Sequence, residues 1–146
     1  MFFGNKELIF DKPLVMGIIN ITTDSFSDGG KFISNNLTSE FDLRKIIKEI
    51  DFLEKSGASF IDIGAESTRP GYSPISIQEE LDRLIPVLEL IAETKSIISI
   101  DTRKPEVMKE VLKFPIGLIN DVSGLTSVLG RKLIKNHNVP ICVMHN

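Results

Sequence analysis

Short apolar runs that alternate with longer amphipathic stretches constrain the fold of this chain more than any other feature. The apolar runs are rich in β-branched residues and end at polar residues, as buried strands do. Because a helical stretch separates each run from the next, we expect the strands to lie parallel in one sheet. The five expected strands are Leu14–Asn20, Ser59–Gly64, Ile97–Asp101, Ile116–Asp121 and Pro140–His145.

The first stretch between strands has a helical spacing of apolar residues from Leu43 to Leu53. Ser39 with Asp42 is the expected cap before this helix, because side-chain oxygens accept the unpaired N–H groups of a first turn. Gly57 is the expected stop, since glycine readily adopts the left-handed backbone of a helix end.

Three further helices are predicted. Ser76 and Glu79 form a capping box for the second, and Pro86 inside it predicts a kink or an end of the first segment. Pro105 suits the first turn of the third helix. A weaker helix is expected over about 127–136.

Two architectures are compatible with this order of elements. One is an open sheet with helices on both faces, and the other is part of a (β/α)₈ barrel. A full barrel takes roughly 250 residues, whereas this chain has 146. If the fold is a barrel, we therefore expect a partial one of about five strands and four helices, as one domain over 1–146 that is incomplete at its C-terminal end.

Polar residues gather at the carboxyl ends of the expected strands, which is where parallel α/β folds bind ligands. Asn20 and Asp24 offer the hard oxygen ligands that suit Mg²⁺. Thr68 and Arg69, in the loop around Gly71, offer hydroxyl, guanidinium and backbone N–H donors for a phosphate.

Asp101 and Asn120 end two further strands and suit the donors and acceptors of a planar heterocycle. Each also has a purely structural interpretation. Asp101 could cap the helix that begins near Pro105, and Asn120 could satisfy backbone groups of its loop. Asp62 lies inside a strand, where a buried charge must be paired or protonated, and we favour a role in supporting the structure or a neighbouring site residue.

Composition excludes several classes of protein. The net charge of −3 argues against a nucleic-acid binder that relies on a basic surface. The single cysteine, Cys142, cannot form an internal disulfide, and we expect it to be buried as a small hydrophobe. No apolar run is long enough for a membrane span, so a cytoplasmic protein is expected. Dinucleotide-binding, Walker and nucleophile-elbow motifs are all missing.

Four segments together resemble the dihydropteroate synthase family. Gly17–Gly30 and Gly57–Gly71 are similar to its first and second signatures, and Ser99–Thr102 and Ile119–Gly124 are similar to its third and fourth strand ends. The motifs are long, and the resemblance extends over essentially the whole chain in the family's order, so together they are highly specific.

The resemblance implies a (β/α)₈ barrel that joins 4-aminobenzoate to 6-hydroxymethyl-7,8-dihydropterin diphosphate, giving 7,8-dihydropteroate for folate synthesis. It implies Mg²⁺ as cofactor and no side-chain nucleophile. By resemblance, Asn20 contacts Mg²⁺ and the diphosphate, Thr68 and Arg69 contact the diphosphate and the aminobenzoate, Asp101 and Asn120 bond the pterin ring, and Phe26, Asp28 and Pro70 lie in loops that close over the aminobenzoate.

The chain departs from the family's pattern in two ways. Thr23 stands where the family commonly has proline, and the family's sixth to eighth strands have no counterpart. These 146 residues are therefore expected to be inactive alone, and to need a complementing C-terminal chain or another copy. The alternatives are a pterin-binding module without turnover and a pterin-binding methyltransferase domain, although the loops 24–30 and 67–71 match the diphosphate enzyme better.

Overall fold

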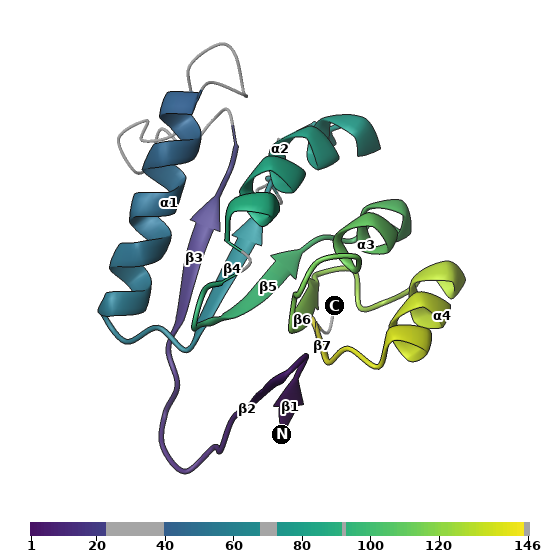
Figure 1. The fold of residues 1–146 in the computed structure, drawn as a ribbon. Coiled ribbons are helices and arrows are strands. Elements are labelled where there is room, and N and C mark those ends of the chain that lie inside the picture. The colour runs from purple at the N-terminus through teal and green to yellow at the C-terminus, as the bar shows by residue number, and fades with distance from the viewer. Residues whose placement is uncertain (23–39, 68–72, 92, 145–146) are drawn as a thin grey trace.

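Five parallel strands form one sheet in the order of the chain (Figure 1). The computed structural model describes residues 1–22, 40–67, 73–91 and 93–144, without the side chains of 40–42. All five predicted strands are confirmed, although several are shorter than expected, and the end expected at His145 lies outside the described residues. The strands are β3 (Met16–Asn20), β4 (Phe60–Gly64), β5 (Ile97–Asp101), β6 (Leu118–Asp121) and β7 (Ile141–Val143).

The four predicted helices are present as α1 (Glu40–Lys55), α2 (Ile77–Leu90), α3 (Pro105–Val111) and α4 (Val128–His137). Their ends follow from local chemistry. The Ser76 hydroxyl accepts the N–H of Glu79 at 3.1 Å, which confirms Ser76 as the cap of α2 and one half of the predicted capping box, whereas the Glu79 carboxylate contacts Arg83. Gly57 has a φ of +95° just after α1, as expected for a helix stop. The cap predicted for α1 lies outside the described residues.

Pro86 lies inside α2, and the helix continues through it to Leu90. The prediction that a helical segment ends at this proline is therefore wrong. Proline removes one helical hydrogen bond to the carbonyl four residues earlier, which is that of Asp82. Because Asp82 is exposed and Pro86 only half-buried, water can hydrate the carbonyl that is left without a donor.

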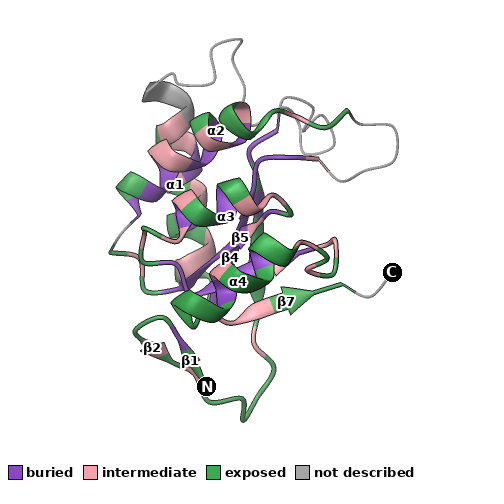
Figure 2. Cartoon of the chain, turned by 90° about the vertical axis from the view of Figure 1, so that its right-hand side faces the viewer, coloured by how far each residue is buried: buried purple, intermediate pink, exposed green. Residues whose placement is uncertain are grey.

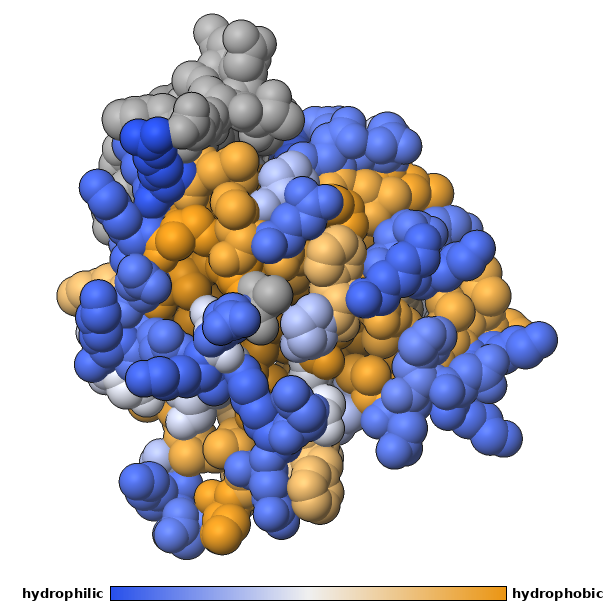
Figure 3. Space-filling view, in the orientation of Figure 1, coloured by the Kyte–Doolittle hydropathy of each residue, from blue (hydrophilic) through white to orange (hydrophobic). Residues whose placement is uncertain are grey.

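The helices cover one face of the sheet (Figure 2) and pack in order, α1 on α2, α2 on α3 and α3 on α4. Ile19, Ile63, Ile100 and Ile119 point to this face and form the centre of the core. On the face shown in Figure 3, hydrophobic residues gather in the middle and hydrophilic residues border them. Helices on a single face contradict the open sheet covered on both sides, and agree with part of a barrel.

The opposite face of the sheet is closed at one end by a hairpin that the sequence did not predict. It consists of β1 (Phe2–Phe3) and β2 (Lys6–Glu7), paired antiparallel. The Phe3 ring meets the Phe60 ring edge-on, with 5.0 Å between centroids. A Cβ at Gly117 would lie only 2.7 Å from Ile97 and 3.1 Å from Phe3, so glycine permits the close approach of the hairpin.

Cys142 on β7 is exposed, so the prediction of a buried cysteine is wrong. The cause is its place in the sheet. β7 is an outer strand of the described sheet, with β6 as its neighbour on one side. The apolar run that contains Cys142 indicates a strand, but it does not indicate how much of that strand is covered.

Candidate functional site

Four residues stand in register at the carboxyl ends of four neighbouring strands. Asn20 pairs with Gly64, Gly64 with Asp101, and Asp101 with Asn120. Paired residues in a parallel sheet point to the same face, so this polar row lies on the face opposite the helices. Three predicted site residues, Asn20, Asp101 and Asn120, are therefore brought together. We call the strand ends around this row the rim.

Gly64 leaves space between two of these side chains. A Cβ built at this position would lie 3.6 Å from the Asn20 Oδ1 atom and 3.5 Å from the Asp101 Oδ2 atom. The amide and the carboxylate therefore approach each other over a residue without a side chain. A ligand can reach the backbone between them, which a larger residue at 64 would prevent.

The orientation of Asn120 is fixed by Asp62, which lies one layer below the polar row and is only 5% exposed. Asp62 accepts a hydrogen bond from Asn120 Nδ2 at 3.0 Å and one from Ser99 Oγ at 2.5 Å. A carboxylate accepts and does not donate, so the amide nitrogen of Asn120 faces Asp62 and its oxygen points away. The alternative that Asn120 satisfies backbone groups is not supported, and both oxygens of the buried Asp62 carboxylate accept a hydrogen bond.

Asp101 has an unusual protonation equilibrium. Burial is the largest cause, followed by the negative charges of nearby carboxylates, and together they raise the pKa of Asp101 to about 7. Near neutral pH this side chain can therefore either donate or accept a hydrogen bond. The alternative of a cap for α3 is wrong, because the residue at the cap position is Lys104. The carboxylates that face Asp101 are Asp62, Glu80, Asp121 and Glu66.

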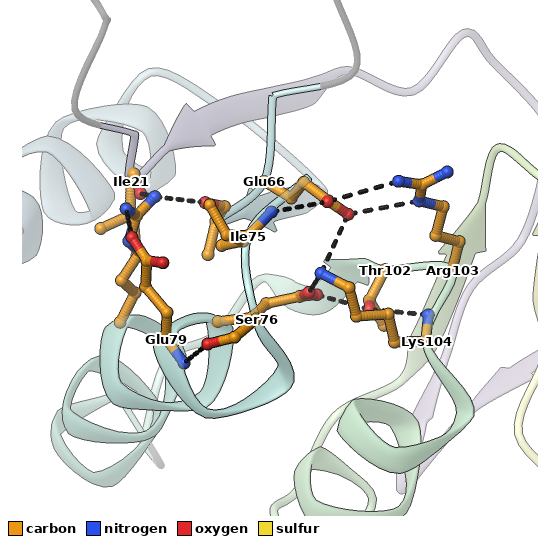
Figure 4. Close-up of polar contacts among 11 residues, drawn as sticks. Ile21, Glu66, Ile75, Ser76, Glu79, Thr102, Arg103 and Lys104 are labelled. Atoms are coloured by element: carbon orange, nitrogen blue, oxygen red, sulfur yellow. Dashed lines mark hydrogen bonds and ion pairs between the residues drawn. The ribbon is translucent and has the colours of Figure 1, made fainter. Parts of the chain in front are cut away.

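A network of charged residues lies beside the rim, and the sequence analysis missed it (Figure 4). Glu66, two residues after β4, contacts Arg103 and Lys104, which follow β5. Lys104 also contacts Glu80, a fully buried residue of α2. Glu80 lies four residues before Leu84 on the buried face of its helix. A charged residue within an apolar helical stripe was the sequence signal that could have predicted this buried contact.

Arg83 of α2 is a second charged residue on this buried face. Its Nη1 donates to the carbonyl of Ala65 at 2.8 Å and to that of Ile21 at 3.4 Å, and Nη2 contacts Glu79. Ile21 follows β3 and Ala65 follows β4. Arg83 therefore holds two strand ends together at the rim.

Five predicted site residues and one further predicted ligand lie outside the described residues. Among the described ones, the expected Mg²⁺ contact, Asn20, is exposed at the end of β3. No group of three or more His, Cys, Asp or Glu residues in this described part could hold a metal ion. The predicted residues that lie outside the described part of the chain are Asp24, Phe26, Asp28, Thr68, Arg69 and Pro70.

The profile of the pterin binding enzyme family matches residues 16–146. The chain belongs to this family. The match covers all five strands of the main sheet and all four helices, and the resemblance to dihydropteroate synthases is confirmed by curated relatives. The dihydropteroate synthases of Escherichia coli K12 and Clostridium beijerinckii are each 40% identical to this member of the family, over 99% and 100% of the chain.

Solved structures agree with these relatives. A Yersinia pestis dihydropteroate synthase in complex with a sulfonamide drug has a TM-score of 0.86 at 38% identity, over 99% of this chain and 50% of that one. The Vibrio fischeri enzyme has a TM-score of 0.79 at 46% identity, over 97% and 48%. The fold is therefore a partial (β/α)₈ barrel.

The chain spans about half the length of the curated relatives it matches, namely 49% of the Escherichia coli enzyme and 52% of the Clostridium beijerinckii enzyme. Among its described helices, none is long and apolar enough to cross a bilayer.

Proposed function

We propose that residues 1–146 form the pterin-binding part of a dihydropteroate synthase. The reaction would condense 6-hydroxymethyl-7,8-dihydropterin diphosphate with 4-aminobenzoate, releasing diphosphate and forming 7,8-dihydropteroate. The similarity to enzymes of that name over nearly the whole chain supports this proposal. Asp101 and Asn120 carry it, because they stand in register at two neighbouring strand ends.

These two residues suit the edge of a pterin ring. The Asn120 amide is oriented by Asp62, so its oxygen is presented away from that carboxylate. Asp101 lies beside it with a pKa raised to about 7 by burial and by neighbouring carboxylates. In the reaction, the bond from the pterin methylene carbon to the diphosphate oxygen breaks, and the amine of the aminobenzoate then bonds to that carbon. Ionised Asp101 would stabilise the positive charge that develops on the ring.

The diphosphate and Mg²⁺ belong at the other end of the polar row. Asn20 presents an amide oxygen at the rim, and Mg²⁺ is commonly held by one or two protein oxygens together with substrate phosphates and water. The donor present therefore fits the ion, which would neutralise charge on the departing diphosphate. We propose that Thr68 and Arg69 bind the diphosphate and the aminobenzoate, and that Phe26, Asp28 and Pro70 help to enclose the aminobenzoate.

Turnover would need polypeptide beyond this region. The outer strands of the described sheet, β3 and β7, each have a neighbour on one side. Ile18 on β3 is 65% exposed on the same face as the polar row. Unpaired strand edges and exposed apolar side chains are typical of surfaces that other strands cover. We propose that a complementing C-terminal segment or chain covers them, or alternatively a second copy, with the assembled protein in the cytoplasm.

Calorimetric titration with the pterin diphosphate and Mg²⁺ tests the half-site. We expect saturable binding by the 146-residue chain, weakened at least about tenfold by Asn120→Ala. Asn136→Ala on the exposed surface of α4 is the matched control and should bind like the unaltered chain. If a folded sample of the unaltered chain binds nothing, these residues do not form a pterin site by themselves.

A pterin-binding module without turnover is the second candidate, because the pterin residues Asp101 and Asn120 lie within a chain that spans half of its relatives. The two functions differ when the remaining barrel strands are supplied as a second polypeptide. Dihydropteroate formation by the mixture supports the synthase. Pterin binding by the mixture without product supports the module.

A further inference from the structure

One buried carboxylate joins the two ends of the loop after β4. Glu66 follows β4 by two residues, and its Oε1 atom accepts the backbone N–H of Ile75 at 3.2 Å. Ile75 lies two residues before α2. Figure 4 shows the Glu66 side chain between Ile75 on one side and Arg103 and Lys104 on the other. The two described ends of the segment between residues 66 and 75 therefore meet at the same side chain.

Lys104 connects this carboxylate to a second one on α2. Its Nζ atom lies 3.2 Å from Glu66 Oε2 and 2.6 Å from Glu80 Oε2. The other oxygen of Glu80 accepts the hydroxyl hydrogen of Thr102 at 2.5 Å. A single ammonium group therefore ties together the segment after β4, the segment after β5 and helix α2.

The charges of this cluster balance. Arg103 contributes the second cation, with Nε and Nη2 each 3.3 Å from an oxygen of Glu66. Two carboxylates, Glu66 and Glu80, therefore face two cations. Burial by itself would raise the pKa of Glu66, but the hydrogen bonds and charges of Arg103 and Lys104 outweigh it and hold that pKa below its usual value. Without Lys104, the fully buried Glu80 would lose the ammonium group in direct contact with its carboxylate, which offsets the cost of burying the charge.

Such a cluster is better suited to fixing an arrangement than to adding stability. Replacing a buried ion pair by well-packed apolar side chains is often neutral or stabilising, since desolvation offsets the attraction between the charges. Directional bonds to an ammonium and a guanidinium do, however, permit only a narrow range of relative positions for the segments that carry them. Glu66, Lys104 and Glu80 come from three such segments.

We propose that Glu66 and Lys104 are positioning residues, which hold both ends of the loop after β4 against the end of β5, so that this loop starts and finishes at fixed points of the rim. The inference rests on the proposed function, which assigns diphosphate binding to Thr68 and Arg69 in that loop. Glu66 and Lys104 act through those donors and need not touch the ligand themselves.

We call the contacts of Glu66 with Ile75, Arg103 and Lys104 the clamp. It can be measured at the Ile75 amide without any ligand. In the ¹⁵N-labelled 146-residue chain, the Ile75 amide signal should shift with pH as Glu66 titrates, with a midpoint below the usual glutamate value. Lys104→Met should raise this midpoint by about one pH unit, because a neighbouring cation lowers a carboxylate pKa by about that much or more. Lys104→Arg should largely restore it. Lys113→Met, which removes a surface ion pair with Glu110, is the matched control and should leave it unchanged.

Positioning is tested with inorganic pyrophosphate in the presence of Mg²⁺. Lys104→Met should weaken pyrophosphate binding by roughly tenfold, the usual effect of removing a residue that orients a ligand-binding group, and Lys104→Arg should recover most of it. Equal affinities of Lys104→Met and Lys113→Met would overturn the proposal, as would an unmoved Ile75 midpoint. If the unaltered chain does not bind pyrophosphate, the diphosphate contact proposed for Thr68 and Arg69 fails for this chain, and the Ile75 midpoint still decides whether the clamp exists.

A second variant covers the case in which Lys104→Met does not fold. The Arg103 side chain is partly exposed, so Arg103→Met removes one of the two cations at lower structural cost. The Ile75 midpoint should rise in this variant as well, and pyrophosphate should bind more weakly. A folded Arg103→Met chain with an unmoved midpoint would contradict the clamp.

Discussion

Asn120 on β6 reaches across β5 to donate its amide hydrogen to Asp62 on β4, with 3.0 Å between Nδ2 and Oδ2. Ser99 of the intervening strand donates to the other oxygen of the same carboxylate. One buried acid therefore aligns side chains from two strands, and the side of Asn120 that we propose to face the pterin is oriented by a residue that is only 5% exposed.

Asp62→Ala should destabilise the chain by about 1–3 kcal/mol, because it leaves the Asn120 amide and the buried Ser99 hydroxyl without their acceptor. The measurement is the free energy of unfolding in urea. Asp51→Ala, at an exposed position of α1, should change it by less than about 0.5 kcal/mol. Similar values for the two variants would mean that the Asp62 carboxylate does not organise these neighbours.

Asp101→Asn should change how stability depends on pH. Burial and nearby carboxylates raise the pKa of Asp101 to about 7 in the folded chain, whereas the unfolded value is about 4. The folded chain holds this proton more tightly, so its contribution to stability is full below about pH 4 and is lost as the pH rises through 7. Asparagine stays neutral and avoids that loss.

The free energy of unfolding of Asp101→Asn, relative to that of the unaltered chain, should therefore rise by about 1–2 kcal/mol between pH 5 and pH 8. This figure is reduced for partial solvent screening. Urea unfolding at both pH values measures it. Asp82→Asn, on the exposed side of α2, should show no such gain. Parallel pH profiles of Asp101→Asn and the unaltered chain would rule out the raised pKa.

Gly64→Leu should weaken binding of the pterin diphosphate by more than about tenfold, because its side chain would fill the space between Asn20 and Asp101. Gly64→Ala places its Cβ 3.4 Å from the nearest Asp101 atom, an ordinary contact, and should bind with little change. Calorimetry compares the two, with circular dichroism to verify that both fold. Equal affinities would show that no ligand group enters this space.

Phe3→Ala should destabilise the chain by about 3–5 kcal/mol, the usual cost of removing a buried aromatic ring. Phe3 is 5% exposed and Phe2 is 64% exposed, so Phe2→Ala in the same strand is the matched control. The free energy of unfolding should change by less than about 0.5 kcal/mol in the control. A small effect of both substitutions would mean that the hairpin does not hold the sheet together in solution.

The order of elements and the polar row were predictable because their signals are local. Apolar periodicity, the Ser76 capping box and the glycine after α1 each depend on residues close in sequence. The polar row needed one further step, since any residue that ends a parallel strand meets its counterparts at the same edge of the sheet. This placed Asn20, Asp101 and Asn120 together before the structure was known.

The features that were missed depend on residues far apart in the chain. The two-residue strands of the hairpin carry no periodicity, and they form only where Phe3 meets Phe60 and Gly117. The contacts of Lys104 with Glu66 and Glu80 span 38 and 24 positions of sequence, a range at which a charge pattern has no direct signal. The exposure of Cys142 follows from the outer place of β7, which residue type does not encode.

The hairpin also sets the order in which this chain can fold as it leaves the ribosome. Each strand of the main sheet pairs with the strand made just before it, so the sheet can grow during synthesis. Phe3, however, packs on Leu118, and Gly4 lies against Ile116. The hairpin is therefore made before the residues that complete its packing, and part of the Phe3 ring stays open to water, chaperones and other nascent chains until Leu118 has been synthesised.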